Sequence, residues 1–237
     1  MSGRVSLAER DIALRELMDD PACDPDQLRA TLRRFDTINR LVSGWGTVYR
    51  RHVRPHLASL GRPARVLDLG CGGGDVVVNL ARRAQRDDLR IEWLGADPDP
   101  RAIEVADARA KPASVRFACT DSTSLLADGE RFDLVVSNHV LHHLSPADLT
   151  RFAAESRQLS RGQVLHGDIE RGHLAYGLYA VGITPFAPGT FLRTDGLRSI
   201  RRSYRREELG ATLGTGWHVT RPVPFRVLAV ASGTADD

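Results

Sequence analysis

An apolar run that leads into a glycine-rich loop is the feature that most restricts how this chain of 237 residues can fold. Residues 66–69 have the sequence Val-Leu-Asp-Leu, and glycine then stands at every second position, at Gly70, Gly72 and Gly74. Such a run is typical of a buried parallel strand, and the glycines allow a sharp turn and close contact between backbone and ligand. Apolar spacing after residue 75 predicts a helix whose positive N-terminal end faces the same ligand. The pattern predicts a nucleotide-type cofactor site at the first strand of an open α/β sheet.

The spacing of the glycines distinguishes between cofactors. The dinucleotide fingerprint is Gly-x-Gly-x-x-Gly. Counted from Gly70 it requires glycine at position 75, which is Asp75, and counted from Gly72 it requires glycine where Val77 stands. The carboxylate of Asp75 would also repel a pyrophosphate. The Asp-x-Gly-x-Gly-x-Gly pattern that begins at Asp68 suits a cationic amino-acid cofactor instead, because acids flank a loop of bare backbone.

At this point the chain resembles the class I S-adenosylmethionine-dependent methyltransferases, and a downstream acid supports the resemblance. Residues 91–96 predict a second strand, which ends at Asp97. Asp97 follows the glycine loop at close to the roughly 20 residues expected for an acid that binds ribose hydroxyls. The resemblance implies S-adenosylmethionine as the cofactor, S-adenosylhomocysteine as the product, and Pro98 as a neighbour of the ribose site.

Two further strands carry residues that the resemblance assigns to the cofactor. Residues 115–118 predict the third strand. The family then implies that Asp121, with Ser122 beside it, accepts a hydrogen bond from the adenine amino group. Residues 132–138 predict the fourth strand, and its last residue, Asn138, borders the transferred methyl group in the family.

The remaining strands complete the predicted sheet. Residues 163–167 predict the fifth strand, and residues 217–220 and 225–231 predict a final hairpin. The predicted class is an α/β fold with a Rossmann-like open seven-stranded sheet, mostly parallel with an antiparallel last strand, and helices on both faces. Residues 1–60 would form an N-terminal helical cap, and residues 61–237 the methyltransferase domain.

Each acid also has a purely structural interpretation. Asp68 can order the loop rather than contact a ligand, and this is the role that we favour for it within the cofactor site. Asp97 can cap the next helix, but its place beyond a strand end favours ribose binding. Asp121 can be an ordinary loop acid, although we favour binding there as well.

Residues 1–60 carry the signals of several helices. Ser6 and Asp24 each begin a capping box, which predicts a helix after both. The second helix would carry an apolar stripe at helical spacing, formed by Leu28, Leu32, Phe35, Ile38 and Val42. A further helix is predicted over residues 45–57. The stripe can close over the cofactor, as N-terminal helices often do in the resembling family, or pack in the core, which we favour for most of it.

The insertion at about residues 172–202 begins without charge. From His173 to Phe191 it has no formally charged residue, so it can form the lid of an apolar pocket or a satellite core on the sheet. An arginine cluster follows, formed by Arg193, Arg198, Arg201, Arg202, Arg205 and Arg206. It can hold an anionic substrate, a carrier protein or an anionic membrane surface, although a solvated helix start is the interpretation that we favour. Ser203 predicts the cap of the helix before the last strands.

Histidines after the fourth strand are the predicted catalytic residues. If the segment forms a helical turn, His139, His142 and His143 share one face. On the fifth strand His166 and Asp168 point to the same side. A phenolic acceptor has a pKa of about 10, so a histidine base would assist its deprotonation. One or more of these histidines can instead be structural, because Leu-His-His-Leu sequences occur in family members of differing chemistry.

No metal site is predicted. Ubiquinone-pathway O-methyltransferases resemble this histidine segment but carry acids and one histidine at the matching spacing. Three imidazoles would suit zinc better than magnesium, and this chain lacks those acids. The three cysteines, Cys23, Cys71 and Cys119, are too far apart for a disulfide framework or a zinc cluster.

The predicted function is methyl transfer to a small lipophilic acceptor, phenolic or polyketide-like, most readily at oxygen, as in bacterial quinone, phenolic-lipid and polyketide pathways. Methylation at a ring carbon is the alternative. A nucleic-acid methyltransferase is disfavoured, because residues 137–140 lack the Asn/Asp-Pro-Pro-aromatic sequence and the net charge is only +3. A non-catalytic cofactor-binding protein is a further alternative. No leader or membrane span is expected, which predicts a cytoplasmic protein. The sequence allows peripheral contact with a membrane. It also allows either a monomer or a homodimer.

Overall fold

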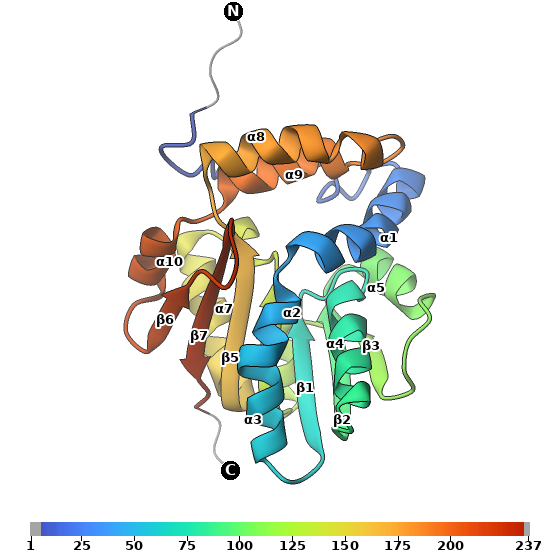
Figure 1. Cartoon of the computed structure of the whole chain (residues 1–237), viewed down its shortest axis with the longest axis vertical. Coiled ribbons are helices and arrows are strands. Elements are labelled where there is room, and N and C mark those ends of the chain that lie inside the picture. Colours follow the sequence, from blue (N-terminus) through green and yellow to red (C-terminus); the bar gives the residue numbers. More distant parts are fainter. Residues whose placement is uncertain (1–5, 235–237) are drawn as a thin grey trace, which may run out of the picture.

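The computed structural model describes residues 6–234 and contains one seven-stranded sheet with the order β3-β2-β1-β4-β5-β7-β6 (Figure 1). The strands are β1 (Ala64–Leu69), β2 (Ile91–Asp97), β3 (Val115–Cys119), β4 (Phe132–Asn138), β5 (Ser160–Ile169), β6 (Trp217–Thr220) and β7 (Arg226–Ser232). Strands β1 to β5 pair in parallel, and β7 is antiparallel to both β5 and β6. The predicted Rossmann-like sheet is confirmed.

Most helices connect successive strands, and within residues 6–234 four further helical segments precede β1. In chain order the helices are α1 (Pro25–Val42), α2 (Trp45–Val48), the π-helix η1 (Tyr49–Val53), α3 (Arg54–Ser59), α4 (Asp75–Arg86), α5 (Pro100–Asp107), α6 (Ser122–Ala127), the 3₁₀-helix η2 (Leu141–His143), α7 (Pro146–Leu159), α8 (His173–Gly182), the 3₁₀-helix η3 (Thr184–Phe186), α9 (Leu192–Arg202) and α10 (Arg206–Leu213). Asp24, Asp99 and Ser145 cap α1, α5 and α7 as predicted, each accepting backbone N–H bonds. Ser203 does not cap α10; the N-cap is Arg205, whose N–H donates to Glu208.

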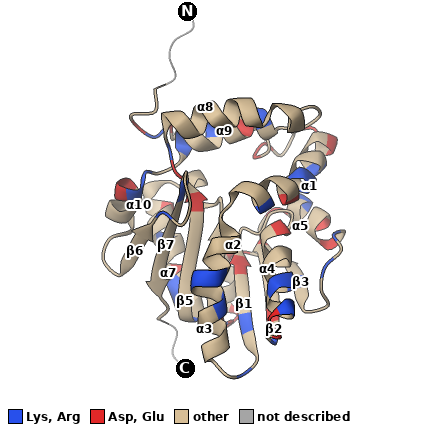
Figure 2. Ribbon diagram, viewed as in Figure 1, with Lys and Arg blue, Asp and Glu red and all other residues tan. Residues whose placement is uncertain are grey.

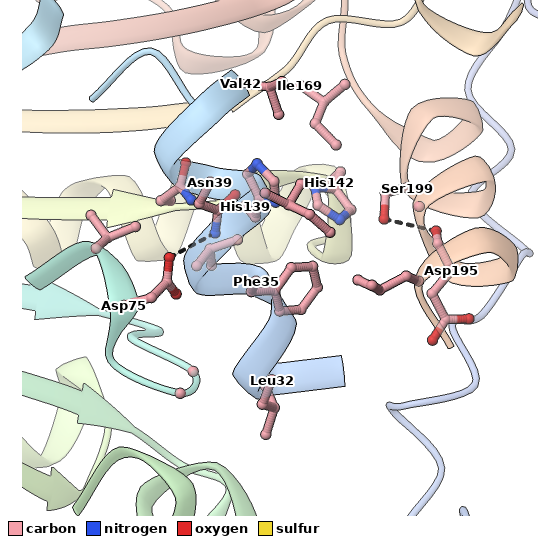
Figure 3. A pocket seen from close by; sticks show the side chains of 18 of the residues that line it. Leu32, Phe35, Asn39, Val42, Asp75, His139, His142, Ile169, Asp195 and Ser199 are labelled. Atoms are coloured by element: carbon pink, nitrogen blue, oxygen red, sulfur yellow. Dashed lines mark hydrogen bonds between the residues drawn. The ribbon is translucent and has the colours of Figure 1, made fainter. Parts of the chain in front are cut away.

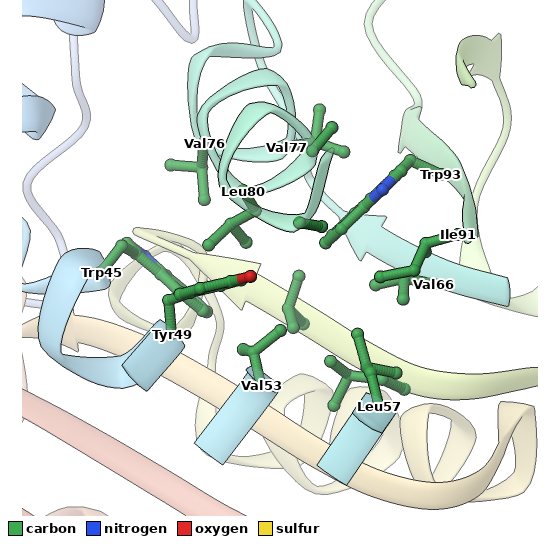
Figure 4. Packing of buried hydrophobic residues seen from close by; sticks show 14 of the residues in the cluster. Trp45, Tyr49, Val53, Leu57, Val66, Val76, Val77, Leu80, Ile91 and Trp93 are labelled. Atoms are coloured by element: carbon green, nitrogen blue, oxygen red, sulfur yellow. The ribbon is translucent and has the colours of Figure 1, made fainter. Parts of the chain in front are cut away.

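Alternating side chains of the central strands build a core on each face of the sheet. Val66 of β1 packs with Tyr49 and Leu80 on the face covered by α2, η1, α3 and α4 (Figure 4). Its neighbour Leu67 packs on the opposite face with Leu159 of α7. Burying one such side chain contributes about 1.5–3 kcal/mol. The two cores hold the carboxyl ends of β1, β2 and β4 in fixed positions, where parallel sheets bind ligands.

Residues 6–24 form no helix, so the helix predicted after Ser6 is wrong. This segment, which we call the strap, runs along α9 and is held there by side chains. Asp195 of α9 accepts hydrogen bonds from the Leu17 and Met18 N–H groups at 2.8 and 3.0 Å. The Arg198 guanidinium donates to the Arg15 carbonyl at 2.7 Å. These bonds take the place of a helical hydrogen-bond pattern.

The arginine cluster is therefore more than the solvated helix start that the sequence favours. Arg201 forms an ion pair with Asp11 of the strap at 2.6 Å, and Arg205 donates to the Leu7 carbonyl at 2.8 Å. Arg202 is buried, because its guanidinium lies between Asp19 of the strap and the segment after β4. Together with Arg198, four of the six arginines thus fasten the strap to the rest of the domain.

Helices α8 and α9 lie across the carboxyl edge of the sheet (Figure 1). Figure 2 shows that α8 carries no charged residue, in contrast to α9. Leu174, Leu178 and Val181 of α8 are more than half exposed. Within residues 6–234, none of the helices combines the length and apolar character needed to span a bilayer.

Candidate active site

A cavity of about 1060 Å³ lies between the sheet edge, α1, the strap and the α8–α9 pair (Figure 3). This is at the upper limit of the roughly 300–1,000 Å³ usual for ligand pockets. We call the part bordered by the glycine loop and the end of β2 the cofactor half. We call the part bordered by the strap, the segment after β4, α8, α9 and the start of β7 the acceptor half. One continuous cavity therefore has room for two ligands.

Glycine 70 and glycine 72 form the wall of the cofactor half as predicted. Gly70 has a φ of 69° and donates to the Ala96 carbonyl at 2.8 Å, which ties the loop to β2. Gly72 has a φ of 52°, and both glycines line the cavity. Left-handed backbone of this kind favours glycine because it has no Cβ.

Gly74 has a different role from the predicted one. It is not among the described residues that line the cavity. Its φ is 74°, and a Cβ at this position would lie 2.4 Å from the Phe117 ring. Gly74 therefore allows the start of α4 to pack closely on β3, and its contribution to the cofactor half is indirect.

Asp97 stands at the end of β2 with its carboxylate at the cavity wall, next to Pro98. Its Oδ2 accepts from the Gly72 N–H at 2.8 Å and its Oδ1 from the Asp99 N–H at 2.9 Å. Burial raises the pKa of Asp97, although these two bonds act in the opposite direction. The carboxylate is thus fixed in place while it still faces the cavity.

Asp68 is buried at the end of β1 and also borders the cavity. Neither of its oxygens has a hydrogen-bond partner within the described chain. Burial, and then the charges of Asp75 and Asp97, raise the pKa of Asp68 well above its usual value. A cationic ligand would offset this accumulation of acids, so the residues present fit a positively charged cofactor.

Two residues of the cofactor half were not predicted as ligand contacts. Asp75, at the first position of α4, lines the cavity and accepts from the Asn39 side-chain amide at 3.0 Å (Figure 3). Asn39 is a buried polar residue on α1. Asp75 belongs to the loop pattern in the sequence, but no local pattern predicts that Asn39 contacts it.

The predicted adenine contacts lie outside the cavity. Asp121 is the N-cap of α6 and accepts from the Ser124 N–H at 2.8 Å. Ser122 donates its hydroxyl hydrogen to Glu155 at 2.5 Å. Neither is among the described lining residues. Capping of α6 explains the acid at this position, so the structure offers no support for adenine recognition by either residue.

His142 is buried in the acceptor half and both of its ring nitrogens face carboxylates. Nδ1 lies 2.8 Å from Asp168 of β5, and Nε2 lies 3.2 Å from Glu16 of the strap. Burial alone would lower the pKa of His142, but the two carboxylates outweigh it and raise the pKa to about 9. His142 is therefore a cation at neutral pH, held between two acids.

His139 does not belong to a helical turn with the other two, because only residues 141–143 are helical and His139 has a φ of 64°. Its backbone N–H donates to the Gly167 carbonyl at 3.0 Å. The Arg226 guanidinium donates to its Nε2. Burial and the charge of Arg226 hold the pKa of His139 well below its usual value. His139 is thus a neutral acceptor at the cavity wall, together with Asn138.

His143 is partly accessible, with 30% of its side chain exposed, whereas His142 is buried. Its Nδ1 lies 3.3 Å from Asp19 and its Nε2 lies 3.8 Å from Glu16, both on the strap. Carboxylates beside its ring nitrogens stabilise the imidazolium that forms when His143 takes a proton. His143 differs from His142 in its greater exposure and in its longer distance to Glu16, 3.8 Å against 3.2 Å, which makes it the candidate general base.

His166 is not positioned to act on a ligand in this cavity. It is fully buried, its Nδ1 lies 2.7 Å from the Ser137 hydroxyl, and its ring stacks on Trp217. Burial lowers the pKa of His166 to about 3. The alternation of β5 does place it on the same side as Asp168, as predicted, but β6 and α7 cover it.

Glu16, His142 and His143 form a cluster whose ligand atoms lie within 4.8 Å of one another. A carboxylate and two imidazoles can bind a divalent cation, and Asp168 on the second nitrogen of His142 would orient that ligand. A proton and a cation would compete for the same nitrogen of His142. The sequence places no acid at the matching spacing near these histidines, because Glu16 lies more than a hundred residues before them. Use of a metal by the protein is untested, and its absence stays a prediction.

The apolar stripe of α1 lines the cavity. Leu28, Leu32, Phe35, Ile38 and Val42 all border it. Leu28 and Leu32 also pack against Val105 of α5. The helix therefore serves both as packing and as a wall, which combines the two predicted interpretations.

Comparison with known proteins agrees with this geometry. Residues 66–163 match a family model described as a methyltransferase domain. The chain is 31% identical over 157 residues to the ubiquinone biosynthesis O-methyltransferase of Brucella anthropi, covering 64% of this chain and 58% of the relative. It is 34% identical over 120 residues to the protein of the same description from Brucella ovis, covering 50% of this chain and 46% of that one. The chain thus spans about half the length of these relatives.

Solved structures share the fold at low sequence identity. The plantazolicin methyltransferase BpumL, in complex with a substrate analogue and S-adenosylhomocysteine, superposes with a TM-score of 0.59 at 11% identity, covering 88% of this chain and 96% of that one. The CurJ carbon methyltransferase superposes with a TM-score of 0.61 at 18% identity, covering 90% of this chain and 61% of that one.

The glycine loop, the sheet order and the matched family model agree with one another. Residues 66–163 match the methyltransferase-domain family, and these findings together support a class I S-adenosylmethionine-dependent methyltransferase. S-adenosylmethionine is the cofactor of this class, and the residues of the cofactor half fit its positive charge.

Proposed function

We propose that the protein transfers the methyl group of S-adenosylmethionine to an oxygen of a small, lipophilic, phenolic or polyketide-like acceptor. The observation that carries the proposal is the continuous cavity that joins the glycine loop to the histidines. The acceptor half has apolar walls from α8 and the residue that follows it, including Leu178 and Ile183. The names of the ubiquinone-pathway relatives support a phenolic acceptor and O-methylation.

The residues of the cofactor half would hold and orient the cofactor. Asp97 is fixed by two backbone N–H groups and would accept hydrogen bonds from the ribose hydroxyls. Asp68 and Asp75 would place negative charge around the loop of bare backbone. S-adenosylmethionine, when bound, supplies a methyl carbon activated by the adjacent sulfonium. Positioning alone can lower the barrier to such a transfer by up to ~7–11 kcal/mol.

His143 would remove the proton from the acceptor hydroxyl. His139 uses its Nε2 to accept from Arg226, and His142 is already protonated between two acids. His143 has Asp19 beside Nδ1 and a partly exposed ring in the cavity. General-base assistance of this kind contributes typically ~10²–10⁴-fold.

The outer segments would enclose the reaction. We propose that residues 1–60 act as the N-terminal cap and that the insertion at about 172–202 acts as the acceptor lid. Glu16 and Asp19 of the strap, α1, and Tyr179 and Ser199 of the insertion all line the cavity, which supports this division. A location in the cytoplasm and the absence of nucleic-acid partners stay predictions.

Incubation with methyl-labelled S-adenosylmethionine and a panel of catechols, simple phenols and quinols tests the proposal. We expect label in a methyl ether, identified by mass spectrometry, and inhibition by S-adenosylhomocysteine. Label on a ring carbon would indicate C-methylation instead. Tight cofactor binding without transfer to any member of the panel, or to polyketide-like aromatics, would count against a phenolic acceptor.

A further inference from the structure

Arg226 is a buried cation in the acceptor half. It is the first residue of β7, is 7% exposed, and lines the cavity. Burial lowers the pKa of Arg226 to about 10, so the guanidinium is still charged at neutral pH. A buried charge is costly unless it is paired and hydrogen-bonded, so the partners of this group matter.

The protein satisfies this guanidinium only in part. Nε donates to the Val42 carbonyl at the end of α1 at 2.9 Å, and Nη1 donates to His139 Nε2. Both partners are neutral. Within residues 6–234 no carboxylate forms an ion pair with Arg226. The carboxylate whose charge acts most on it, Asp168, already accepts from His142 and from the Ile169 N–H. An arginine has five N–H donors, so the fork retains capacity for another acceptor.

Other arginines at the cavity are in a different situation. Arg40 pairs with Asp36 at 2.7 Å and Arg101 pairs with Asp99 at 2.7 Å. Arg50 is exposed at the rim and donates to the Thr47 hydroxyl. Among these cavity arginines of the described chain, Arg226 alone combines burial with the lack of an acidic partner.

Unusual backbone holds both members of the Arg226–His139 pair. Phe225, directly before Arg226, has a φ of 63°, and His139 has a φ of 64°. Within residues 6–234 only Asp88 is a further non-glycine residue with positive φ. Such conformations are costly for bulky residues and gather at binding and active sites. The strain is consistent with a pair that is positioned for a ligand.

We propose that Arg226 binds an oxyanion of the methyl acceptor, either a carboxylate carried by the acceptor or the reacting oxygen in its phenolate form. This inference rests on the proposed function, because it concerns the ligand of the acceptor half. The planar fork of arginine is suited to oxygen anions. His139 acts as a positioning residue, since its neutral Nε2 holds one arm of the fork. Arg226 would thus select acidic acceptors over neutral ones of the same shape.

Calorimetric titration of the S-adenosylhomocysteine complex tests the inference without requiring turnover. The probes are 3,4-dihydroxybenzoate, its methyl ester, and 4-nitrocatechol, whose colour reports its ionisation. The variants are Arg226→Gln, which removes the charge, and Arg226→Lys, which keeps it without the fork. Arg50→Gln serves as the matched control at the rim of the same cavity. Unchanged affinity for S-adenosylhomocysteine shows that each variant is folded.

If the carboxylate is the ligand, wild type binds the acid more tightly than the ester, and Arg226→Gln loses about 10- to 150-fold in affinity for the acid only. If the phenolate is the ligand, wild type lowers the pKa of bound 4-nitrocatechol, and Arg226→Gln abolishes that spectral shift. Arg226→Lys should retain part of either effect, and Arg50→Gln should retain all of it.

Two results would overturn the inference. One is a wild type that shows no preference for the anionic probes. The other is an Arg226→Gln variant that retains the wild-type preference. Failure of methyl transfer to phenols, with the anion preference intact, would reject the proposed reaction and leave the anion site standing.

Discussion

The two halves of the cavity are built in opposite ways. The cofactor half comes almost entirely from residues 68–99, and its main groups are backbone and three acids that lie close together in the chain. The acceptor half combines the segment after β4, the α8–α9 pair and Arg226 with the strap, which lies more than a hundred residues before them in the sequence. A contiguous motif therefore defines the first ligand, whereas only folding brings together the groups that define the second.

The two halves also differ in their electrostatics. In the cofactor half, Asp68, Asp75 and Asp97 lie near one another and form no ion pair among the described residues, and burial raises the pKa of both Asp68 and Asp97. In the acceptor half, acids and cations alternate: Glu16, His142 and Asp168 form a chain, and Arg202 pairs with Asp19. One half is prepared for a cation, and the other is largely neutralised by its own residues.

The largest expected effect falls on the acceptor half. Replacement of His143 by Gln should lower kcat by about 10²–10⁴-fold, because the general base is lost, and should leave the affinity for S-adenosylhomocysteine unchanged. An acceptor with a more acidic phenol should recover part of the rate. Steady-state kinetics on the acceptor found in the panel measures this. His173→Gln, on the exposed start of α8, is the control; a wild-type rate in His143→Gln would exclude this base.

In the cofactor half, Asp97→Ala should weaken cofactor binding by about 1.5–3 kcal/mol, the usual contribution of hydrogen bonds to a charged group. Titration calorimetry with S-adenosylhomocysteine measures the change. Asp121→Ala should leave the affinity unchanged, because that carboxylate caps α6 outside the cavity. An equal loss of affinity in both variants would instead support the adenine contact that the sequence predicts for Asp121.

Replacement of His166 tests whether this residue is a neutral histidine of the sheet interior and not a part of the acceptor half. Its folded-state pKa of about 3 lies below the value of about 6.5 in an unfolded chain, so the unfolded chain binds the proton first. The stability from neutral His166 is complete above pH 6.5 and is lost as the pH falls toward 3, at a slope approaching 1.4 kcal/mol per pH unit. Urea unfolding at several pH values should show a shallower slope for His166→Leu. His218→Gln, on the exposed face of β6, should keep the wild-type slope.

The smallest effect is expected where the strap meets α9. Asp195→Asn replaces a charged acceptor of two N–H bonds with a neutral one, which should cost about 1 kcal/mol. We expect KM for the acceptor to rise about fivefold and cofactor affinity to stay the same, together with faster proteolysis within residues 6–24. Equal losses for both ligands would contradict the separation of the two halves.

Most of the fold could be predicted from the sequence because its signals are local. The run before Gly70, the acid at Asp97 and the cap at Ser145 each depend on neighbouring residues, and the sheet follows from their order. The strap could not be predicted in this way. Its Ser6 motif indicates a helix, but Asp195 and the arginines of α9, almost two hundred residues away, bind its backbone in another conformation.

The site residues also divide into those that local patterns predict and those that they do not. Asp68, Gly70, Gly72 and Asp97 line the cavity as predicted, because the loop and the ends of parallel strands determine their positions. Histidines 139, 142 and 143 also reach it, but their different states depend on Glu16, Asp168 and Arg226. No local pattern marks those partners, so a sequence can locate these histidines without showing which of them is held as a cation between two acids.

The irregular course of the strap has a practical consequence for anyone who trims or tags the protein. Glu16 and Asp19 reach the histidines only when the strap is docked on α9. A shortened version that begins at α1 would retain the whole glycine loop and would pass a thermal-shift screen with S-adenosylhomocysteine. It would nevertheless lack two of the carboxylates around its base, so ligand-induced stabilisation would be a misleading quality test for expression clones.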